Sequence, residues 1–209
     1  MPYILANGVS IYYEEHGAGE PLLLLHGGGA TIETSFAAQI PEMAQRYRVI
    51  APERRGQGHT ADVDGPITYD LMTRDTAAFM EALGLESAHI AGWSDGGIVG
   101  LLLATTRPDL VRKLVAIGAN FDASGLTDAF IGWMRDRMSA DTFPARDREA
   151  YARASPDGPE HFAVVLDKVK RMWLSEPAIP IEDLRTIAAP TLVLVGDGDM
   201  IEMEHTLEL

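Results

Sequence analysis

The segment Gly92-Trp93-Ser94-Asp95-Gly96 places a serine hydroxyl in a setting suited to nucleophilic chemistry. A short strand-like run, residues 89–91, precedes it, and an apolar helix-like run, residues 98–104, follows it. A sharp turn between a strand and a helix would hold the hydroxyl of Ser94 exposed above a sheet. We therefore predict that Ser94 attacks a carbonyl carbon, in preference to a role limited to capping the helix that follows.

The same turn supplies a donor for the negative charge that such an attack creates. Asp95 opens the predicted helix, and the first N–H groups of a helix have no partner within it. The amide of Asp95 would therefore point toward a developing oxyanion. Trp93 is the aromatic residue best placed to contact a substrate. For a further set at helical spacing, packing between helices is the favoured interpretation: Phe130, Trp133, Met134, Met172 and Trp173.

Strand and helix patterns alternate along the chain, as a parallel sheet behind that turn requires. Strand patterns cover residues 3–6, 9–15, 21–25, 47–51, 111–117 and 191–195, with the hairpin signal Asn7-Gly8 between the first two. Helix patterns cover residues 34–46 and 68–83. The predicted fold class is therefore α/β, a mostly parallel sheet flanked by helices.

The alternation stops between residues 120 and 189, where only helix-like pieces occur, at residues 126–138, 147–154 and 160–174. We interpret this stretch as a helical insertion over the carboxyl edge of the sheet, where ligands bind in open α/β sheets. The predicted organisation is a core domain over residues 1–119, a helical cap over 120–187 and a continuation of the core over 188–209.

Composition excludes several classes of function. The 209 residues carry a formal net charge of −14, which argues against nucleic acid and anionic membranes as partners. The absence of cysteine excludes disulfides, cysteine-ligated zinc and a thiol nucleophile. The histidines have no spacing typical of metal ligands. With no signal-peptide pattern at the start, we expect a cytoplasmic protein that acts on a small molecule without metal or cofactor.

The chain resembles the α/β-hydrolase superfamily over nearly its whole length. The resemblance is carried by the order and spacing of four motifs: Leu25-His26-Gly27-Gly28-Gly29, Arg55-Gly56-Gln57-Gly58, the Ser94 turn, and Val195-Gly196-Asp197-Gly198-Asp199. It implies hydrolysis of an ester, lactone or related bond by a Ser–acid–His triad through an acyl-enzyme. It also implies that the amide of Gly28 joins that of Asp95 in the oxyanion hole, and that His26 braces the loop around Gly28.

The resemblance implies an acid at Asp199, just past the strand 191–195; Asp122, after the preceding strand, and Asp197 stay open as alternatives. The family's histidine follows the acid by some tens of residues, after one more strand, whereas this sequence ends at Leu209. His205 comes too early and is expected on a helix, facing solvent. We therefore expect a C-terminally truncated fold without the final strand, histidine loop and helix.

Two consequences follow from that expectation. The strand 191–195 becomes an edge, and unpaired edges favour pairing with another chain, so that a homo-oligomer through this edge is possible. The chain alone should show little or no esterase turnover, because the base is missing. The alternative is a non-catalytic or fragment form of the fold that acts as a ligand-binding or scaffold protein.

Overall fold

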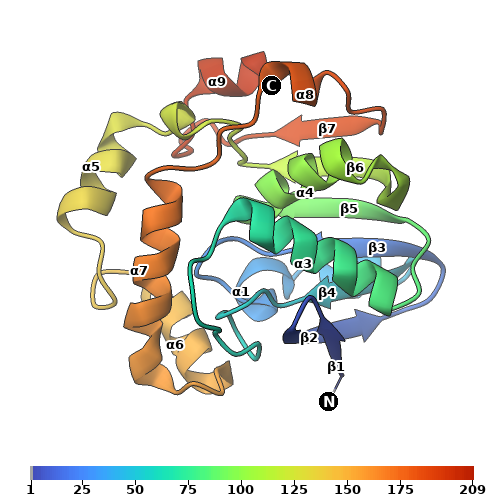
Figure 1. Cartoon of the computed structure of the whole chain (residues 1–209), viewed down its shortest axis with the longest axis horizontal. Coiled ribbons are helices and arrows are strands. Elements are labelled where there is room, and N and C mark those ends of the chain that lie inside the picture. Colours follow the sequence, from blue (N-terminus) through green and yellow to red (C-terminus); the bar gives the residue numbers. More distant parts are fainter. Residues whose placement is uncertain (1) are drawn as a thin grey trace.

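The computed structural model describes residues 2–209, and a seven-stranded sheet lies at its centre (Figure 1). The strands are β1 Tyr3–Ala6, β2 Val9–His16, β3 Glu20–Leu25, β4 Tyr47–Pro52, β5 Ala88–Trp93, β6 Val111–Ile117 and β7 Thr191–Leu194. Their order across the sheet is β1-β2-β4-β3-β5-β6-β7. The first two pairings are antiparallel and all later ones are parallel, which confirms the predicted fold class.

Helices lie on both faces of this sheet. The longer ones are α3 Tyr69–Ala82, α4 Asp95–Thr106, α5 Asp128–Asp136, α6 Ala145–Ala154 and α7 Phe162–Trp173. The short ones are α1 Ile32–Phe36, α2 Ile40–Met43, α8 Ile181–Leu184 and α9 Met203–Glu208, with 3-10 turns at Pro108–Leu110, Ala123–Gly125 and Pro159–His161. α3 and α4 cover one face, and α1 and α2 cover part of the other (Figure 1).

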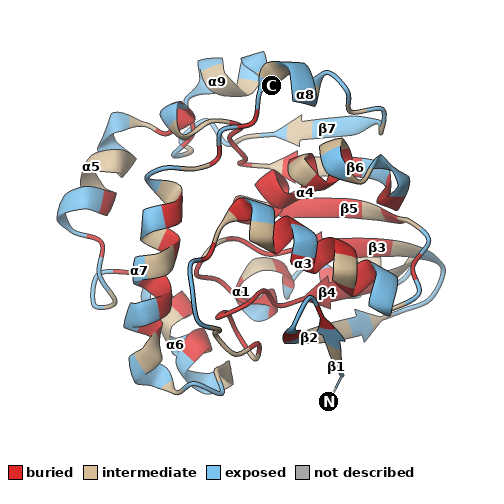
Figure 2. Ribbon diagram, viewed as in Figure 1, coloured by how far each residue is buried: buried red, intermediate tan, exposed pale blue. Residues whose placement is uncertain are grey.

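The central strands β3, β4 and β5 are the most deeply buried (Figure 2). In β3 the consecutive residues Leu23, Leu24 and Leu25 are each at most 1% exposed. Both faces of this strand are covered by helices, which is why its sequence is a continuous apolar run rather than an alternating one. The sheet thus provides a rigid base for the turns at its carboxyl edge.

The predicted strands all form, with ends close to those expected, whereas the single helix predicted over residues 34–46 is wrong. The structure has two short helices there, α1 and α2, separated by residues 37–39. Pro41 lies in the first turn of α2. Proline has no N–H to continue a helix that arrives from residue 37, but it suits the first turn of a new one.

The segment predicted as a cap, residues 120–187, contains α5, α6, α7 and α8. α5, α6 and α7 lie beyond the carboxyl ends of the parallel strands (Figure 1). α7 turns one apolar stripe inward, made of Phe162, Val165, Leu166, Val169 and Met172, each less than 5% exposed. This stripe has the 3- and 4-residue spacing of an amphipathic helix, and its burial fixes α7 over the edge of the sheet.

The last strand, β7, is an edge of the sheet and is largely exposed (Figure 2). Leu192 pairs with Val115 of β6, and Leu194 pairs with Ile117. Residues paired in register lie on the same face, so these four side chains form one apolar surface, called below the open sheet face. Among residues 2–209, no helix has the length and apolar character needed to cross a bilayer.

Candidate active site

Ser94 lies at the bend between β5 and α4. Its backbone has φ 53° and ψ −122°, a conformation that residues other than glycine rarely adopt. The amide of Ser94 donates to the carbonyl of Ile117 at 2.7 Å, and its carbonyl accepts the amides of Gly97 and Ile98 at 2.8 and 3.1 Å. These bonds hold the strained bend in place, while the Ser94 hydroxyl stays partly exposed and lines a pocket.

The glycines on either side of Ser94 are needed because the backbone is crowded there. A Cβ at Gly92 would overlap the carbonyl of Gly96. A Cβ at Gly96 would overlap the carbonyl of Leu25, at the end of β3. Glycine at both positions therefore allows α4 to start close to the ends of two strands, which gives the Gly-x-Ser-x-Gly spacing its physical reason.

The loop of residues 26–31 passes beside this bend and brings Gly28 to it. A Cβ on Gly28 would overlap the carboxylate of Asp95, so the two residues are in direct contact. Gly29 has φ 67°, in the left-handed region, and donates its amide to Gln57 Oε1 at 2.8 Å. The amides of Gly28 and Asp95 donate to no acceptor within residues 2–209. Two unpaired donors thus lie at the mouth of the same pocket.

His26 and Arg54 support this loop from beneath. His26 Nε2 accepts the backbone amide of Arg54 at 3.1 Å, which places its ring proton on Nδ1, and Nδ1 donates to the carbonyl of Gly27 at 2.8 Å. Burial, followed by the charge of Arg54, holds the pKa of His26 well below its usual value of 6.5. His26 is therefore a neutral structural donor, as the sequence indicated, and its nitrogens are occupied.

The side chain of Asp95 lies inside the site and is only 2% exposed. Its Oδ1 accepts hydrogen bonds from the hydroxyl of Tyr69 at 2.9 Å and from Nε1 of Trp173 at 2.8 Å, whereas its Oδ2 has no partner within residues 2–209. Burial raises the pKa of Asp95, and the charge of Arg54 opposes that rise. Burial and the neighbouring Asp95 raise the pKa of Tyr69 well above its usual value, so its hydroxyl stays a donor.

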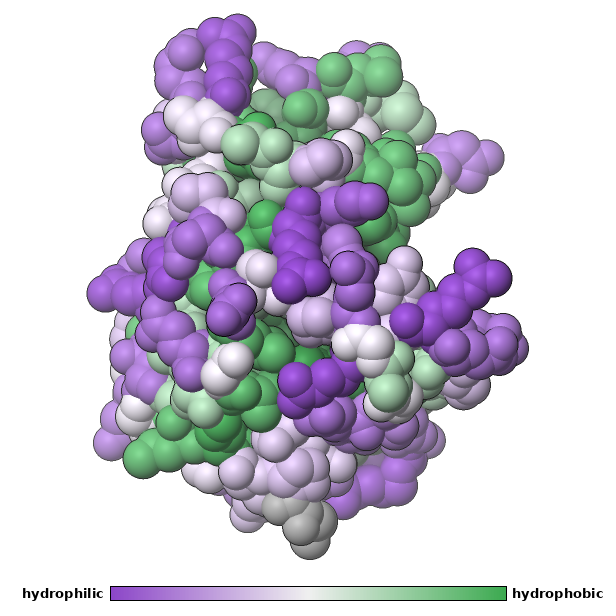
Figure 3. Space-filling model, turned by 90° about the vertical axis from the view of Figure 1, so that its right-hand side faces the viewer, coloured by the Kyte–Doolittle hydropathy of each residue, from purple (hydrophilic) through white to green (hydrophobic). Residues whose placement is uncertain are grey.

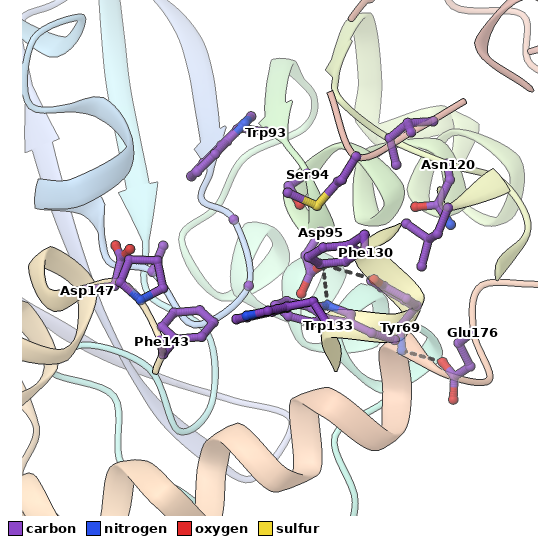
Figure 4. A pocket seen from close by; sticks show the side chains of 18 residues that line it. Tyr69, Trp93, Ser94, Asp95, Asn120, Phe130, Trp133, Phe143, Asp147 and Glu176 are labelled. Atoms are coloured by element: carbon purple, nitrogen blue, oxygen red, sulfur yellow. Dashed lines mark hydrogen bonds between the residues drawn. The ribbon is translucent and has the colours of Figure 1, made fainter. Parts of the chain in front are cut away.

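The pocket above Ser94 encloses about 170 Å³ between the sheet edge and the helices α5 and α7. Figure 4 shows Ser94 and Asp95 on one side of it, with the ring of Phe130 at the level of Asp95 and those of Trp133 and Phe143 below in that view. Trp93 also contributes to the lining. The pocket is thus mainly aromatic, a surface suited to an apolar or aromatic substrate group.

The interpretation of the aromatic and methionine set as packing between helices holds only in part. Met134 and Met172 are at most 2% exposed and pack in the core. Phe130, Trp133 and Trp173 instead line the pocket, and Trp173 is also the indole donor to Asp95. Helical spacing does not separate these two outcomes, because the pocket and the core lie on the same side of the helices.

Asp199 follows β7 in a tight turn. Its Oδ1 accepts the amides of Met200 and Ile201 at 2.7 and 3.3 Å, and its carboxylate lies beside Gly118, at the end of β6. The other candidates differ. Asp122 Oδ1 is occupied by the amide and hydroxyl of Ser124, and Asp197 is exposed. Of the three, Asp199 is the one whose carboxylate lies beside Gly118, directly after β6.

The position predicted for His205 is wrong in one respect. It does lie on a helix, α9, but it is half-buried instead of facing solvent. Its ring stacks on Phe121 at 3.9 Å between centroids, and its Nε2 accepts the amide of Phe121 at 3.2 Å. The Nε2 lone pair is thus occupied by a backbone amide, and His205 is not among the residues that line the pocket at Ser94.

Several residues of the site have no signal in the sequence. Tyr69 begins α3, Asn120 follows β6, and Asp147 and Glu176 come from the 120–187 segment, yet all line the pocket. Glu176 Oε2 also accepts the amide of Tyr69 at 2.9 Å. Their roles depend on which parts of the chain meet, and that is not encoded by local spacing.

Comparison with known proteins gives the wider setting of this site. A sequence model described as alpha/beta hydrolase fold matches residues 20–182, which include the 26–31 loop and the Ser94 bend. The chain belongs to the alpha/beta hydrolase fold family. The solved structure of a meta-cleavage product hydrolase from Pseudomonas fluorescens covers 100% of the chain with a TM-score of 0.79 and 27% identity, and 84% of that structure is matched.

Two curated relatives of this hydrolase-family chain are named as hydrolases. The putative carbamate hydrolase RutD of Azorhizobium caulinodans is 37% identical over 75% of the chain. The matched part spans 57% of the length of that relative. The 2-hydroxy-6-oxo-2,4-heptadienoate hydrolase of Pseudomonas putida is 30% identical over 99% of the chain and 82% of its own length. These similarities support an enzyme that hydrolyses ester or related bonds.

Proposed function

We propose that this chain is a serine hydrolase of carboxylic esters, lactones or related carbonyl compounds. The Ser94 oxygen attacks the carbonyl carbon, and the carbonyl electron pair moves onto its oxygen. The amides of Gly28 and Asp95 stabilise that oxyanion until it collapses, expels the leaving group and leaves an acyl-enzyme that water then hydrolyses. The observation that carries the proposal is the strained, accessible Ser94 beside two unpaired amides in one pocket.

Charge at the pocket narrows the class of substrate. Asp95, Asp147 and Glu176 line it, whereas arginine, lysine and histidine are absent from its lining within residues 2–209. Carboxylates in an apolar pocket repel an anion strongly because the local dielectric is low. We therefore propose a neutral or cationic substrate with an apolar or aromatic acyl group, unlike the dienoate that names the Pseudomonas putida relative.

Proton transfer is the incomplete part of this arrangement. None of the six histidines of the chain lines the pocket within the described residues. We propose that Asp199 is the acid that would orient a histidine base, with Gly118 and the end of β6 beside it. Because no such base faces Ser94 within residues 2–209, a ligand-binding protein that retains this pocket is the second candidate function. We keep the cytoplasm as the expected location.

Acylation of Ser94 is the test that separates these functions. The chain is incubated with the neutral ester p-nitrophenyl acetate, and intact-protein mass spectrometry with peptide mapping follows the acetyl adduct. We expect slow acetylation of Ser94 that speeds up with added imidazole, because a free base supplies part of the roughly 10²–10⁴-fold that general-base catalysis contributes. Ser94→Ala should remove the adduct.

A fluorophosphonate probe provides an independent reading of the same hydroxyl. Adduct formation on lysines or at the N-terminus, equal in the parent chain and in Ser94→Ala, would contradict the hydrolase proposal. Saturable binding of p-nitrophenyl acetate without any Ser94 adduct, in the presence of imidazole, would favour the ligand-binding protein instead.

A further inference from the structure

The carbonyl of Gly27 accepts more hydrogen bonds than an ordinary loop carbonyl. Nδ1 of His26 and Nη2 of Arg54 each donate to it at 2.8 Å, and the amide of Ala30 donates at 3.4 Å. This carbonyl and the amide of Gly28 belong to one peptide group. In a trans peptide the two point in opposite directions, so donors that hold the carbonyl on one side fix the direction of the amide on the other.

Arg54 is an unusual donor because it is a buried cation. The residue is 4% exposed, and its Nε and Nη1 have no hydrogen-bond partner within residues 2–209. No carboxylate of the described chain lies within ion-pair distance of its guanidinium, in contrast to the adjacent Arg55, which binds Asp75 at 2.6 Å. Its close polar contacts are with the Gly27 carbonyl and the His26 ring, both in the 26–31 loop. Burying a cation without an ion-pair partner lowers the stability of a fold, so its presence here suggests a role in that loop.

The loop has a reason to need a positive charge. Oδ2 of Asp95 lies against Gly28, so a buried carboxylate is adjacent to the amide that would bind the oxyanion. A negative charge there disfavours the second negative charge that develops in the transition state. Arg54 is the cation whose charge acts on Asp95, and Asp95 acts on Arg54 in return.

We propose that Arg54 is a positioning residue of the oxyanion hole. Its guanidinium orients and polarises the Gly27–Gly28 peptide and offsets the charge of the Asp95 carboxylate, so that the Gly28 amide becomes a stronger donor to the oxyanion. This inference rests on the proposed serine hydrolase function. A polarised peptide is a property of the resting protein too, which makes it measurable without turnover.

Substitutions at position 54 test this with two readouts. The first is the rate of Ser94 acetylation by p-nitrophenyl acetate with imidazole present, and the second is the ¹⁵N and ¹H resonance of the Gly28 amide. We expect Arg54→Gln to slow acetylation about tenfold, part of the roughly 10²–10³-fold lost when a whole oxyanion donor is removed. We also expect it to move the Gly28 resonance upfield. Arg54→Lys, which keeps the charge, should recover part of both.

Arg55→Gln is the matched control. Arg55 is also buried and adjacent in sequence, but its side chain bonds to Asp75 and not to the 26–31 loop. The Arg55→Gln variant should be less stable than the parent chain, but its acetylation rate and its Gly28 resonance should match those of the parent chain. A merely structural role of Arg54 would make the two variants behave alike, and that result would overturn the proposal.

A second pair of variants covers the case in which Arg54→Gln does not fold. That change leaves Asp95 as a buried anion without its cation, so Asp95→Asn is made alone and together with Arg54→Gln. Compared with Asp95→Asn alone, the double variant Asp95→Asn, Arg54→Gln should still show an upfield shift of the Gly28 resonance. If Ser94 is acetylated at equal rates in both chains and the resonance is unmoved, Arg54 does not act on the peptide. If Ser94 never reacts, the hydrolase proposal fails, while the resonance still decides whether Arg54 polarises Gly28.

Discussion

At the residue scale, the site is built from polar groups that are buried and have assigned partners. His26 is 1% exposed and both its ring nitrogens are engaged, one by the Arg54 amide and one by the Gly27 carbonyl. Asp95 receives donors from an α3 residue and an α7 residue on one oxygen. Buried groups of this kind stabilise one arrangement only while their protonation states are maintained.

The burial of His26 predicts a loss of stability in mild acid. The folded pKa is lowered, so below about 6.5 the unfolded chain binds a proton that the folded chain does not, and the free energy of unfolding falls as the pH falls. One such group contributes at most about 1.4 kcal/mol per pH unit. His26→Gln should be less stable than the parent chain at neutral pH. Its free energy of unfolding, measured with urea, should fall less than that of the parent chain between a pH of about 7.5 and about 5.5. An equal loss in both chains would mean that His26 does not titrate in this way.

The sequence predicts Ser94 as the nucleophile and the amide of Asp95 as a donor from local geometry, since both need only the strand, the turn and the helix that surround them. The donor role of Gly28 comes from the family resemblance, and all three roles stay proposals. Arg54 and Tyr69 are different, since they reach Gly27 and Asp95 from segments distant in sequence, the loop after β4 and the start of α3. The unpaired oxygen of Asp95 is likewise a property of the packed site.

At the scale of elements, α7 is bonded to the core at three points. His161 Nε2, just before its first residue, and Lys168 Nζ, in its middle, donate to Asp62 Oδ2 at 2.9 and 2.7 Å, in the loop between β4 and α3. At its end, Trp173 donates to Asp95 at 2.8 Å. The helix is therefore fixed over the pocket by polar contacts as well as by its apolar stripe. Its length and face were predictable from its spacing, but these partners were not.

The Asp62 contacts predict an effect that depends on pH. Burial alone would raise the pKa of Asp62, but the hydrogen bonds from Lys168 and His161 outweigh it and lower the pKa below 3.8. Asp62→Asn should reduce the free energy of unfolding by about 2 kcal/mol at neutral pH. The difference from the parent chain should shrink as the pH falls through the lowered pKa, where the parent carboxylate also becomes neutral.

Asp70→Asn is the control for that comparison, measured by urea unfolding at the same series of pH values. Asp70 pairs with Arg74 on α3, and its side chain is 69% exposed. Exposed pairs contribute little, so this variant should stay within about 0.5 kcal/mol of the parent chain at neutral pH. If Asp62→Asn behaves like Asp70→Asn, Asp62 does not hold α7 to the core.

At the scale of the whole molecule, one end of the sheet is only partly covered. α1 and α2 pack mainly over β3 and β4, whereas the open sheet face, Val115, Ile117, Leu192 and Leu194, runs from the margin of that cluster at Val115 out to the exposed strand β7. Leu192 is 53% exposed and Leu194 is 43% exposed. Hydrophobic surface also lies in the upper part of Figure 3, at the level of β7, α8 and α9. A contiguous apolar surface beside an unpaired strand favours association.

We expect this face to govern self-association of the chain. The double variant Leu192→Lys, Leu194→Lys should reduce concentration-dependent association in sedimentation velocity, because charge on an edge strand opposes pairing with another strand. Leu5→Lys is the control, since Leu5 is 72% exposed but lies on β1 at the opposite edge. Its association should match that of the parent chain. Association unchanged in the double variant would place the contact elsewhere.

The hydrogen bond from the Trp173 indole to Asp95 couples α7, in the segment of residues 120–187, to the turn that carries Ser94. Asp95, next to the proposed nucleophile Ser94, obtains one of its donors from α7, which also contributes to the pocket lining. Replacing residues 120–187 with the corresponding segment of another protein would therefore remove a hydrogen-bond donor from Asp95. Libraries that diversify this segment to change selectivity should hold position 173 constant and vary Phe130 and Trp133 instead.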